Sequence, residues 1–282
     1  MNKIQIPTLY QKLPITFGLK NNTSLPPFII NKVLNPIFSP IGVPFLELIE
    51  IPSTNSYAIE MIQANLAEHG TTFFAHSQTA GKGQRGKKWI TEPSNNIIIS
   101  SVIDTSTLSL NNQFLFSVGI SLACKDFLSS YAGEETVIKW PNDIYWRDRK
   151  AAGILIENII RGQEWQWAVV GIGANINQTT FSTELKNPVS LKQITGKTFD
   201  TVALSKELCS FLDIRFQQLK QGDHKELLEE YNLHLFKRNI KVHLRKGNIT
   251  FEAKIKGVNE YGQLLVEDTI QDTFSFGEVE WV

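Results

Sequence analysis

The stretch AGKGQRGKKWITEPSNNIIISSVID (80–104) decides the class of fold, because it places a glycine-rich loop directly before a strand. Its three glycines match the G-x-G-x-x-G fingerprint of dinucleotide-binding loops, and residues 81–87 match most of a Walker A phosphate loop. The dinucleotide fingerprint needs a helix immediately after the loop, since the helix N-terminus receives the phosphate. Pro93 and the apolar run that follows it indicate a strand instead, and Lys88 replaces the Walker A hydroxyl. The sequence therefore argues against both motifs.

The loop still has the composition of an anion-binding segment. Residues 73–91 contain no acidic residue, whereas four cations lie close together: Lys82, Arg85, Lys87 and Lys88. Glycines let backbone N–H groups approach a ligand closely and form an anion-binding nest. We therefore expect the loop to hold a polyanion, the alternative being a basic hairpin turn that contacts only solvent.

Two further segments carry polar residues at the ends of apolar strands. In KWPNDIYWRDRKAAGILIE (139–157), a Pro-Asn-Asp turn separates two strands, and Lys150 begins the apolar one, where its ammonium can point into a cleft. In WAVVGIGANIN (167–177), Gly171 and Gly173 allow a ligand or another backbone to come near. The alternatives are a hairpin with surface charges in the first segment and simple turn capping by Asn175 in the second.

Hydrophobic periodicity predicts an α+β fold with a mixed or mainly antiparallel sheet and packed helices. A first helix is expected after the capping residues Ser53, Thr54 and Asn55, with Ala58, Ile62 and Leu66 inward and its end at Gly70. Strands are expected at 45–51, 71–76, 95–104, 136–140, 153–160 and 167–173, and further helices at 111–131, 200–220 and 223–236. From Arg238 onward only short strands and turns are expected, which suggests a small second β domain.

Composition excludes several broad classes of function. The 282 residues hold 28 basic and 28 acidic side chains, so no general attraction to nucleic acid or a membrane surface is expected. Cys124 and Cys209 cannot form a disulfide framework and are expected in the core, as suits a reducing compartment. No apolar run reaches the roughly 18 residues of a membrane helix. Seven of the eleven prolines fall within residues 1–44, which predicts an extended arm without a helix-turn-helix.

Four blocks in this order resemble the biotin protein ligases. They are Ser53-Thr54-Asn55, QTAGKGQRGKKW (78–89), KWPNDI with RKAAGILIE (139–157) and GIGANIN (171–177), and the resemblance extends over roughly residues 45–282. It implies a class II synthetase-like catalytic domain at 45–236 and a C-terminal SH3-like β-barrel at 237–282, after the arm 1–44. It also implies a ligase that converts biotin and ATP to biotinyl-5′-AMP and passes biotin to a lysine of a carrier domain.

The resemblance assigns roles residue by residue. The catalytic group would be Lys150, Lys82 and Arg85, with Lys150 between the biotin carboxylate and the α-phosphate. Biotin would contact Ser53, Thr54, Asn55, Gln78, Lys82, Gly83, Gln84, Lys150, Gly153 and Gly171. ATP would contact Arg85, Lys87, Lys88, Trp89, Lys139, Asn142, Asp143 and Asn175. Mg²⁺ would arrive with ATP near Asn142 and Asp143, without a cage made of protein ligands alone.

Departures from the family pattern refine these expectations. Lys82 and Gln84 occupy positions where the family usually has arginines, so we expect weaker retention of the adenylate. The family often has an arginine shortly after its last Gly-Glu pair, but none follows Gly277-Glu278. The sequence also shows no pattern typical of an N-terminal winged helix, which favours a ligase without DNA binding.

The expected partner is the biotin carboxyl carrier domain of a biotin-dependent carboxylase such as acetyl-CoA carboxylase. We expect a cytoplasmic monomer or homodimer that binds neither nucleic acid nor a membrane. The alternatives are a lipoate or octanoate ligase or transferase of the same fold, and a biotin-sensing regulator.

Overall fold

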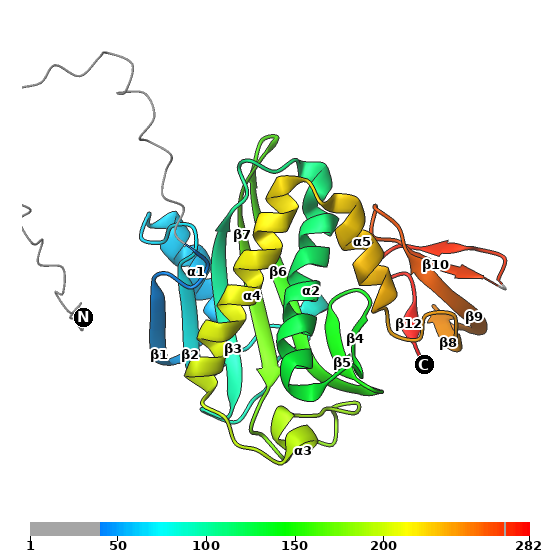
Figure 1. Cartoon of the computed structure of the whole chain (residues 1–282), viewed down its shortest axis with the longest axis horizontal. Helices are drawn as coiled ribbons and strands as arrows, with labels where there is room; N and C mark the ends of the chain where they lie inside the picture. Colours follow the sequence, from blue (N-terminus) through cyan, green and yellow to red (C-terminus); the bar gives the residue numbers. More distant parts are fainter. Residues whose placement is uncertain (1–39, 268) are drawn as a thin grey trace, which may run out of the picture. The chain divides into compact units, whose positions relative to one another are not determined.

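A seven-stranded mixed sheet forms the body of the protein in the computed structural model, which describes residues 40–267 and 269–282 (Figure 1). The predicted arm, apart from residues 40–44, lies outside the described residues. In sheet order the strands are β1 (Phe45–Ile51), β2 (Thr72–Gln78), β3 (Asn96–Asp104), β7 (Glu164–Asn175), β6 (Arg149–Arg161), β5 (Asp143–Trp146) and β4 (Thr136–Lys139). Only β1 and β2 pair in parallel, so the expected mixed sheet is confirmed.

Helices cover the two faces of this sheet unequally. The long helices α2 (Gln113–Ala132) and α4 (Thr201–Gln221) pack on one face and against each other, with α5 (His224–Leu233) beside them (Figure 1). The short helix α1 (Thr54–Gln63) packs on the other face. Strand alternation explains the division, because Phe74 joins the core under α2 and α4 while Phe73 joins the smaller core under α1. Much of the second face is thereby left for a pocket.

The first helix is shorter than the sequence suggested. It ends at Gln63, and Asn65 adopts a left-handed backbone with φ of 54°, which stops the helix before Gly70. Leu66 is 68% exposed, so its expected inward position is wrong, whereas Ala58 and Ile62 are buried as expected. The predicted helix 111–131 corresponds to α2, which follows a 3-10 turn, η2 (Leu110–Asn112).

One short helix was not foreseen. Helix α3 (Leu191–Thr195) starts with a capping box in which Ser190 and Gln193 exchange hydrogen bonds, and it ends at Gly196 in a left-handed conformation. The sequence held this signal in the S-x-x-Q spacing followed by glycine. Cys124 and Cys209 are both buried free thiols, as expected, and burial raises the pKa of Cys209 to about 11.

A second, five-stranded antiparallel sheet follows the last helix, in agreement with the expected β segment. Its strands are β8 (Lys241–Lys246), β9 (Ile249–Val258), β10 (Leu264–Glu267), β11 (Thr273–Phe274) and β12 (Glu280–Trp281), in the order β11-β10-β9-β8-β12. Ala253 and Ile255 are buried in β9, but Ile249 at its start is 69% exposed. Within the ranges 40–267 and 269–282, no helix has the length and apolar character needed to cross a bilayer.

Candidate active site

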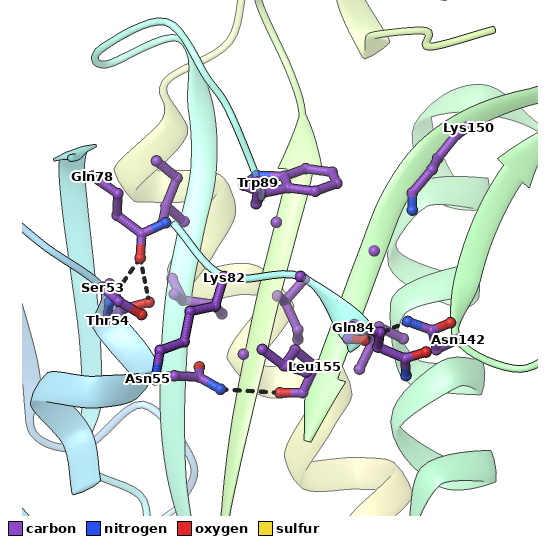
Figure 2. Close-up of a pocket in the computed structure, with 18 residues that line it drawn as sticks. Ser53, Thr54, Asn55, Gln78, Lys82, Gln84, Trp89, Asn142, Lys150 and Leu155 are labelled. Atoms are coloured by element: carbon purple, nitrogen blue, oxygen red, sulfur yellow. Dashed lines mark hydrogen bonds between the residues drawn. The ribbon is translucent and has the colours of Figure 1, made fainter. Parts of the chain in front are cut away.

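A pocket opens on the sheet face that α1 leaves partly uncovered. The N-terminal end of α1, the loop 79–90 and strands β3, β6 and β7 surround it (Figure 2). Its lining residues are Ser53, Thr54, Asn55, Gln78, Lys82, Gly83, Gln84, Trp89, Ile98, Ile99, Asn142, Lys150, Gly153, Ile154, Leu155, Gly171, Ile172 and Gly173. Twelve of the eighteen residues assigned a catalytic, biotin or ATP role are among them, including every one assigned to biotin.

One end of the pocket is polar and buried. Ser53, Thr54 and Asn55 are only 3–4% exposed, although all three have polar side chains. The side chain of Ser53 does not cap α1, contrary to expectation; instead Gln78 Oε1, from the end of β2, accepts from the Thr54 backbone N–H at 2.7 Å. Thr54 Oγ1 also lies 3.2 Å from the same oxygen. The amide nitrogen of Gln78 therefore remains as the donor end of this side chain.

Asn55 is held by a network that the sequence did not reveal. Its Nδ2 donates to Glu157 Oε2 at 2.7 Å and to the Leu155 carbonyl at 3.3 Å, a bond visible in Figure 2. Its Oδ1 lies 2.5 Å from Ser100 Oγ. A Cβ atom at Gly171 would come within 2.2 Å of Asn55 Oδ1, so only glycine leaves room for this amide.

The glycine-rich loop joins β2 to β3, as the sequence indicated, and contains only a 3-10 turn, η1 (Gln84–Gly86). Backbone hydrogen bonds from Gly83 N to Lys87 O and from Trp89 N to Gly81 O fold the loop back on itself. Arg85 takes a left-handed conformation at its tip, with φ of 55°. The loop is therefore a folded, hairpin-like connection between two strands, and its basic side chains are exposed, with Lys82 also lining the pocket.

The indole of Trp89 fills the middle of the pocket. In Figure 2 it lies between Gln78 on one side and Lys150 on the other. A Cβ at Gly173 would come within 2.2 Å of the indole, and one at Gly153 would come within 3.2 Å. The indole nitrogen is buried without a hydrogen-bond partner among the described residues. The two glycines thus provide the space that the ring occupies.

Lys150 stands at the opposite end from Asn55. Its Nζ lies 2.6 Å from Asp143 Oδ1 and 5.6 Å from the centroid of the Trp89 ring. The backbone of β6 is anchored here, because Asn175 Nδ2 donates to the Lys150 carbonyl at 3.3 Å. Asn142 Nδ2 donates to the Ile154 carbonyl at 2.7 Å, which fixes the adjacent turn. A cation at the entrance of an apolar strand is what the sequence predicted.

Six singled-out residues do not line the pocket. Asp143 and Asn175 support Lys150 from outside it, and the side chains of Lys87 and Lys88 are exposed on the loop. Arg85 turns away toward the second sheet, where its Nη1 lies 3.4 Å from the Gly277 carbonyl. Lys139 is the remaining one.

Lys139 is enclosed by three aromatic rings. Its Nζ lies 4.6 Å from the ring centroid of Tyr145, 5.4 Å from that of Phe236 and 5.2 Å from that of Trp281. Burial lowers the pKa of this ammonium, while the nearby Asp143 carboxylate acts in the opposite direction. Since Trp281 belongs to β12, Lys139 links the two sheets in this structure.

Ser100 and Glu157 are the polar residues that sequence reasoning missed. Ser100 is fully buried in β3 and lies 2.7 Å from Thr54 Oγ1. Glu157 bonds Asn55 and also lies 3.9 Å from Lys82 Nζ. Ser100 could have been noticed as a polar residue within an apolar strand. Glu157 belongs to the stretch RKAAGILIE, but nothing in the sequence indicated a role for it.

The described residues contain no group of three or more His, Cys, Asp or Glu side chains able to hold a metal ion. The Asp143 carboxylate is already engaged by Lys150, and the Asn142 amide by a backbone carbonyl. A divalent cation at this end of the pocket would accordingly need ligands from a bound phosphate as well.

Comparisons with known proteins agree with this fold. Residues 47–175 match the biotin/lipoate A/B protein ligase family. The bifunctional ligase/repressor BirA of Bacillus spizizenii is 30% identical over 223 residues, which cover 77% of this chain and 67% of the relative. The biotin--[acetyl-CoA-carboxylase] ligase of Paracoccus denitrificans is 33% identical over 126 residues, covering 44% of this chain and 51% of the relative. The biotin protein ligase from Aquifex aeolicus in complex with biotin and ATP superimposes with a TM-score of 0.70 at 25% identity, covering 84% and 97% of the two chains.

Proposed function

The chain belongs to the biotin protein ligase family, and on this premise we propose that it activates biotin with ATP and attaches it to a lysine of a carboxylase carrier domain. One observation carries the proposal for this chain's own residues. A single pocket has buried hydrogen-bonding groups at one end and an ion-paired lysine at the other, under a basic loop. That arrangement suits a ligand with a polar neutral head and an anionic tail.

In the first step, a biotin carboxylate oxygen forms a bond to the α-phosphorus of ATP, and the bond from that phosphorus to pyrophosphate breaks. Two anions must approach each other, so fixed cations lower the barrier by stabilising the charge of the transition state. Lys150 is the residue proposed for this role, with Asp143 holding its ammonium in place. Alignment of two bound reactants contributes up to about 7–11 kcal/mol in favourable cases.

In the second step, a carrier lysine forms a C–N bond to the biotinyl carbonyl carbon, AMP leaves with the electrons of the C–O bond, and the amine loses a proton. The mixed anhydride must be kept from water until the carrier arrives. The loop 79–90 is suited to cover it, because Lys82, Gly83, Gln84 and Trp89 already line the pocket.

The remaining roles follow from position. We assign the biotin head to Ser53, Thr54, Asn55 and Gln78, with Gly153 and Gly171 giving it room. ATP would lie toward Asn142, Trp89 and the exposed cations of the loop, and Mg²⁺ would reach Asn142 and Asp143 only together with its phosphates. Lys139 and Asn175 would act by supporting the region of Lys150.

We expect this chain to act in the cytoplasm, with a carboxylase as its protein partner. The relative from Paracoccus denitrificans is named for acetyl-CoA-carboxylase, which supports a carrier domain of that enzyme class as the acceptor here. The buried free thiols of Cys124 and Cys209 suit a reducing compartment.

The decisive experiment is exchange of labelled pyrophosphate into ATP by the purified full chain, with biotin, lipoate and octanoate in parallel. We expect exchange only with biotin. Exchange with lipoate or octanoate instead would assign the chain to the other branch of its family, and no exchange with any acid by folded protein would refute the proposal.

A further inference from the structure

The Glu157 carboxylate joins the polar end of the pocket to the basic loop. Its side chain, on β6, is 32% exposed and divides its two oxygens between different partners. Oε2 accepts from Asn55 Nδ2 at 2.7 Å, whereas Oε1 lies 3.9 Å from Lys82 Nζ. The first contact is a well-formed hydrogen bond to a residue that is 4% exposed, and the second is a loose ion pair at the surface.

The amide of Asn55 has all its donor hydrogens engaged. A side-chain amide offers two N–H donors and one oxygen with two lone pairs. Both donors are directed to acceptors, namely Glu157 Oε2 and the Leu155 carbonyl. The oxygen, which lies over Gly171, is reached only by Ser100 Oγ among the described residues. One lone pair of this oxygen is therefore left for a ligand.

We propose that Glu157 is a positioning residue that fixes the orientation of the Asn55 amide, so that Asn55 presents an acceptor to the ligand. An ionised carboxylate can only accept, so it repels the oxygen end of the amide and holds the nitrogen end. A ligand group that bonds to Asn55 must then be a hydrogen-bond donor. The inference rests on the proposed function, in which the ureido N–H groups of biotin enter this end of the pocket.

Replacement of Glu157 by glutamine is the direct test, because glutamine keeps the shape but can either donate or accept. Only the longer 3.3 Å contact to the Leu155 carbonyl then holds the nitrogen end of the Asn55 amide, so the amide turns over in part of the molecules and its oxygen no longer always faces the ligand. Isothermal titration calorimetry should show biotin affinity about 10-fold weaker, as for loss of a hydrogen bond to a charged group. ATP affinity and kcat for exchange at saturating biotin should change less than about 2-fold. Glu164→Gln, an exposed change at the start of β7, should leave biotin affinity unchanged.

Exchanging the donor and the acceptor between residues 55 and 157 distinguishes an effect on the orientation of the residue 55 side chain from a simple loss of packing. Asn55→Asp alone would set two carboxylates against each other and should weaken biotin binding strongly. Combined with Glu157→Gln, the donor and acceptor exchange places, since the glutamine N–H₂ can donate to the aspartate while an aspartate oxygen still faces the pocket. The double variant should bind biotin at least about 5-fold more tightly than Asn55→Asp, a coupling that independent sites do not show.

Thermal melts of all variants establish that folded protein is compared. The inference is overturned if Glu157→Gln binds biotin as the wild type does, or if the losses in the double variant simply add. If the wild type catalyses biotin-dependent exchange and Glu157→Gln binds biotin normally, the role of Glu157 is refuted while the proposed function stands. Wild-type protein that fails to bind biotin refutes the proposed function and this inference together.

Discussion

Lys150 Nζ and Asp143 Oδ1 lie 2.6 Å apart at the end of the pocket opposite Asn55. The lysine is the second residue of β6 and the aspartate begins β5, so the pairing of these two strands holds the pair together. Only the lysine lines the pocket, which makes the aspartate a support that orients the ammonium from outside.

The Lys150–Asp143 pair gives the first prediction. Lys150→Ala should abolish biotin-dependent pyrophosphate exchange, a loss of at least about 100-fold in kcat, because the cation between the two reacting anions is removed. Asp143→Asn keeps the lysine charge but loosens its position, and should cost about 10-fold. Lys225→Ala, at an 82% exposed side chain of α5, is the control and should behave as wild type. Full activity of Lys150→Ala would contradict the assigned role.

The glycine beneath Asn55 gives the second prediction. In Gly171→Ala the new methyl group would lie within 2.2 Å of Asn55 Oδ1, so the amide must move and biotin affinity should fall by about 10-fold or more. Gly119→Ala in α2 is the matched control, since its methyl group would meet nothing closer than 3.7 Å. Calorimetry with biotin measures both variants. Equal biotin affinities would show that Asn55 is not part of the biotin site.

Gln84 gives the third prediction. It lines the pocket within the basic loop, at a position where the resemblance to the family implies an arginine, whose side chain can bind phosphate through two N–H groups. Gln84→Arg should slow the release of biotinyl-5′-AMP by about 10-fold, measured as the dissociation rate of the labelled adenylate. Gln63→Arg adds the same charge at the exposed end of α1 and should leave that rate unchanged. An unaltered release rate in Gln84→Arg would end this explanation.

His234, next to the end of α5, gives a prediction about pH. Its Nε2 lies 3.3 Å from Lys125 Nζ, and its pKa is lowered from 6.5 first by burial and then by that lysine, with Arg215 adding to the effect and the Glu230 and Asp126 carboxylates opposing it. As the pH falls below about 6.5, the unfolded chain binds a proton at His234 more readily than the folded chain does. The free energy of unfolding therefore decreases with falling pH until the lowered pKa of the folded state is passed.

His234→Gln should therefore lose less stability between pH 7.5 and 5.5 than the wild type does. Urea titrations at the two pH values measure the difference, which should stay below about 1 kcal/mol because solvent screens a partly exposed group. Identical pH dependence of wild type and His234→Gln would contradict the prediction.

Several features were predictable from local sequence alone. The strand after the glycine-rich loop follows from Pro93 and the β-branched run beyond it, and a strand at this place excludes a dinucleotide fold, which requires a helix there. The sequence also predicted the position of Lys150 near the start of an apolar strand, and the mixed sheet with a second β segment. These features depend on interactions between near neighbours in the chain, which periodicity and turn chemistry express directly.

Other features depended on which distant segments meet. The end of α1 is the exception, since it is set locally by the left-handed Asn65 and was misplaced because Gly70 was taken as the stop. The aromatic surroundings of Lys139 were not foreseen, because Phe236 and Trp281 come from remote segments of the chain. The chain's own sequence thus determined the polar and charged residues of the pocket. Only tertiary structure decided that Glu157 faces Asn55 across 102 positions, because strand pairing and helix docking bring such residues together irrespective of their spacing.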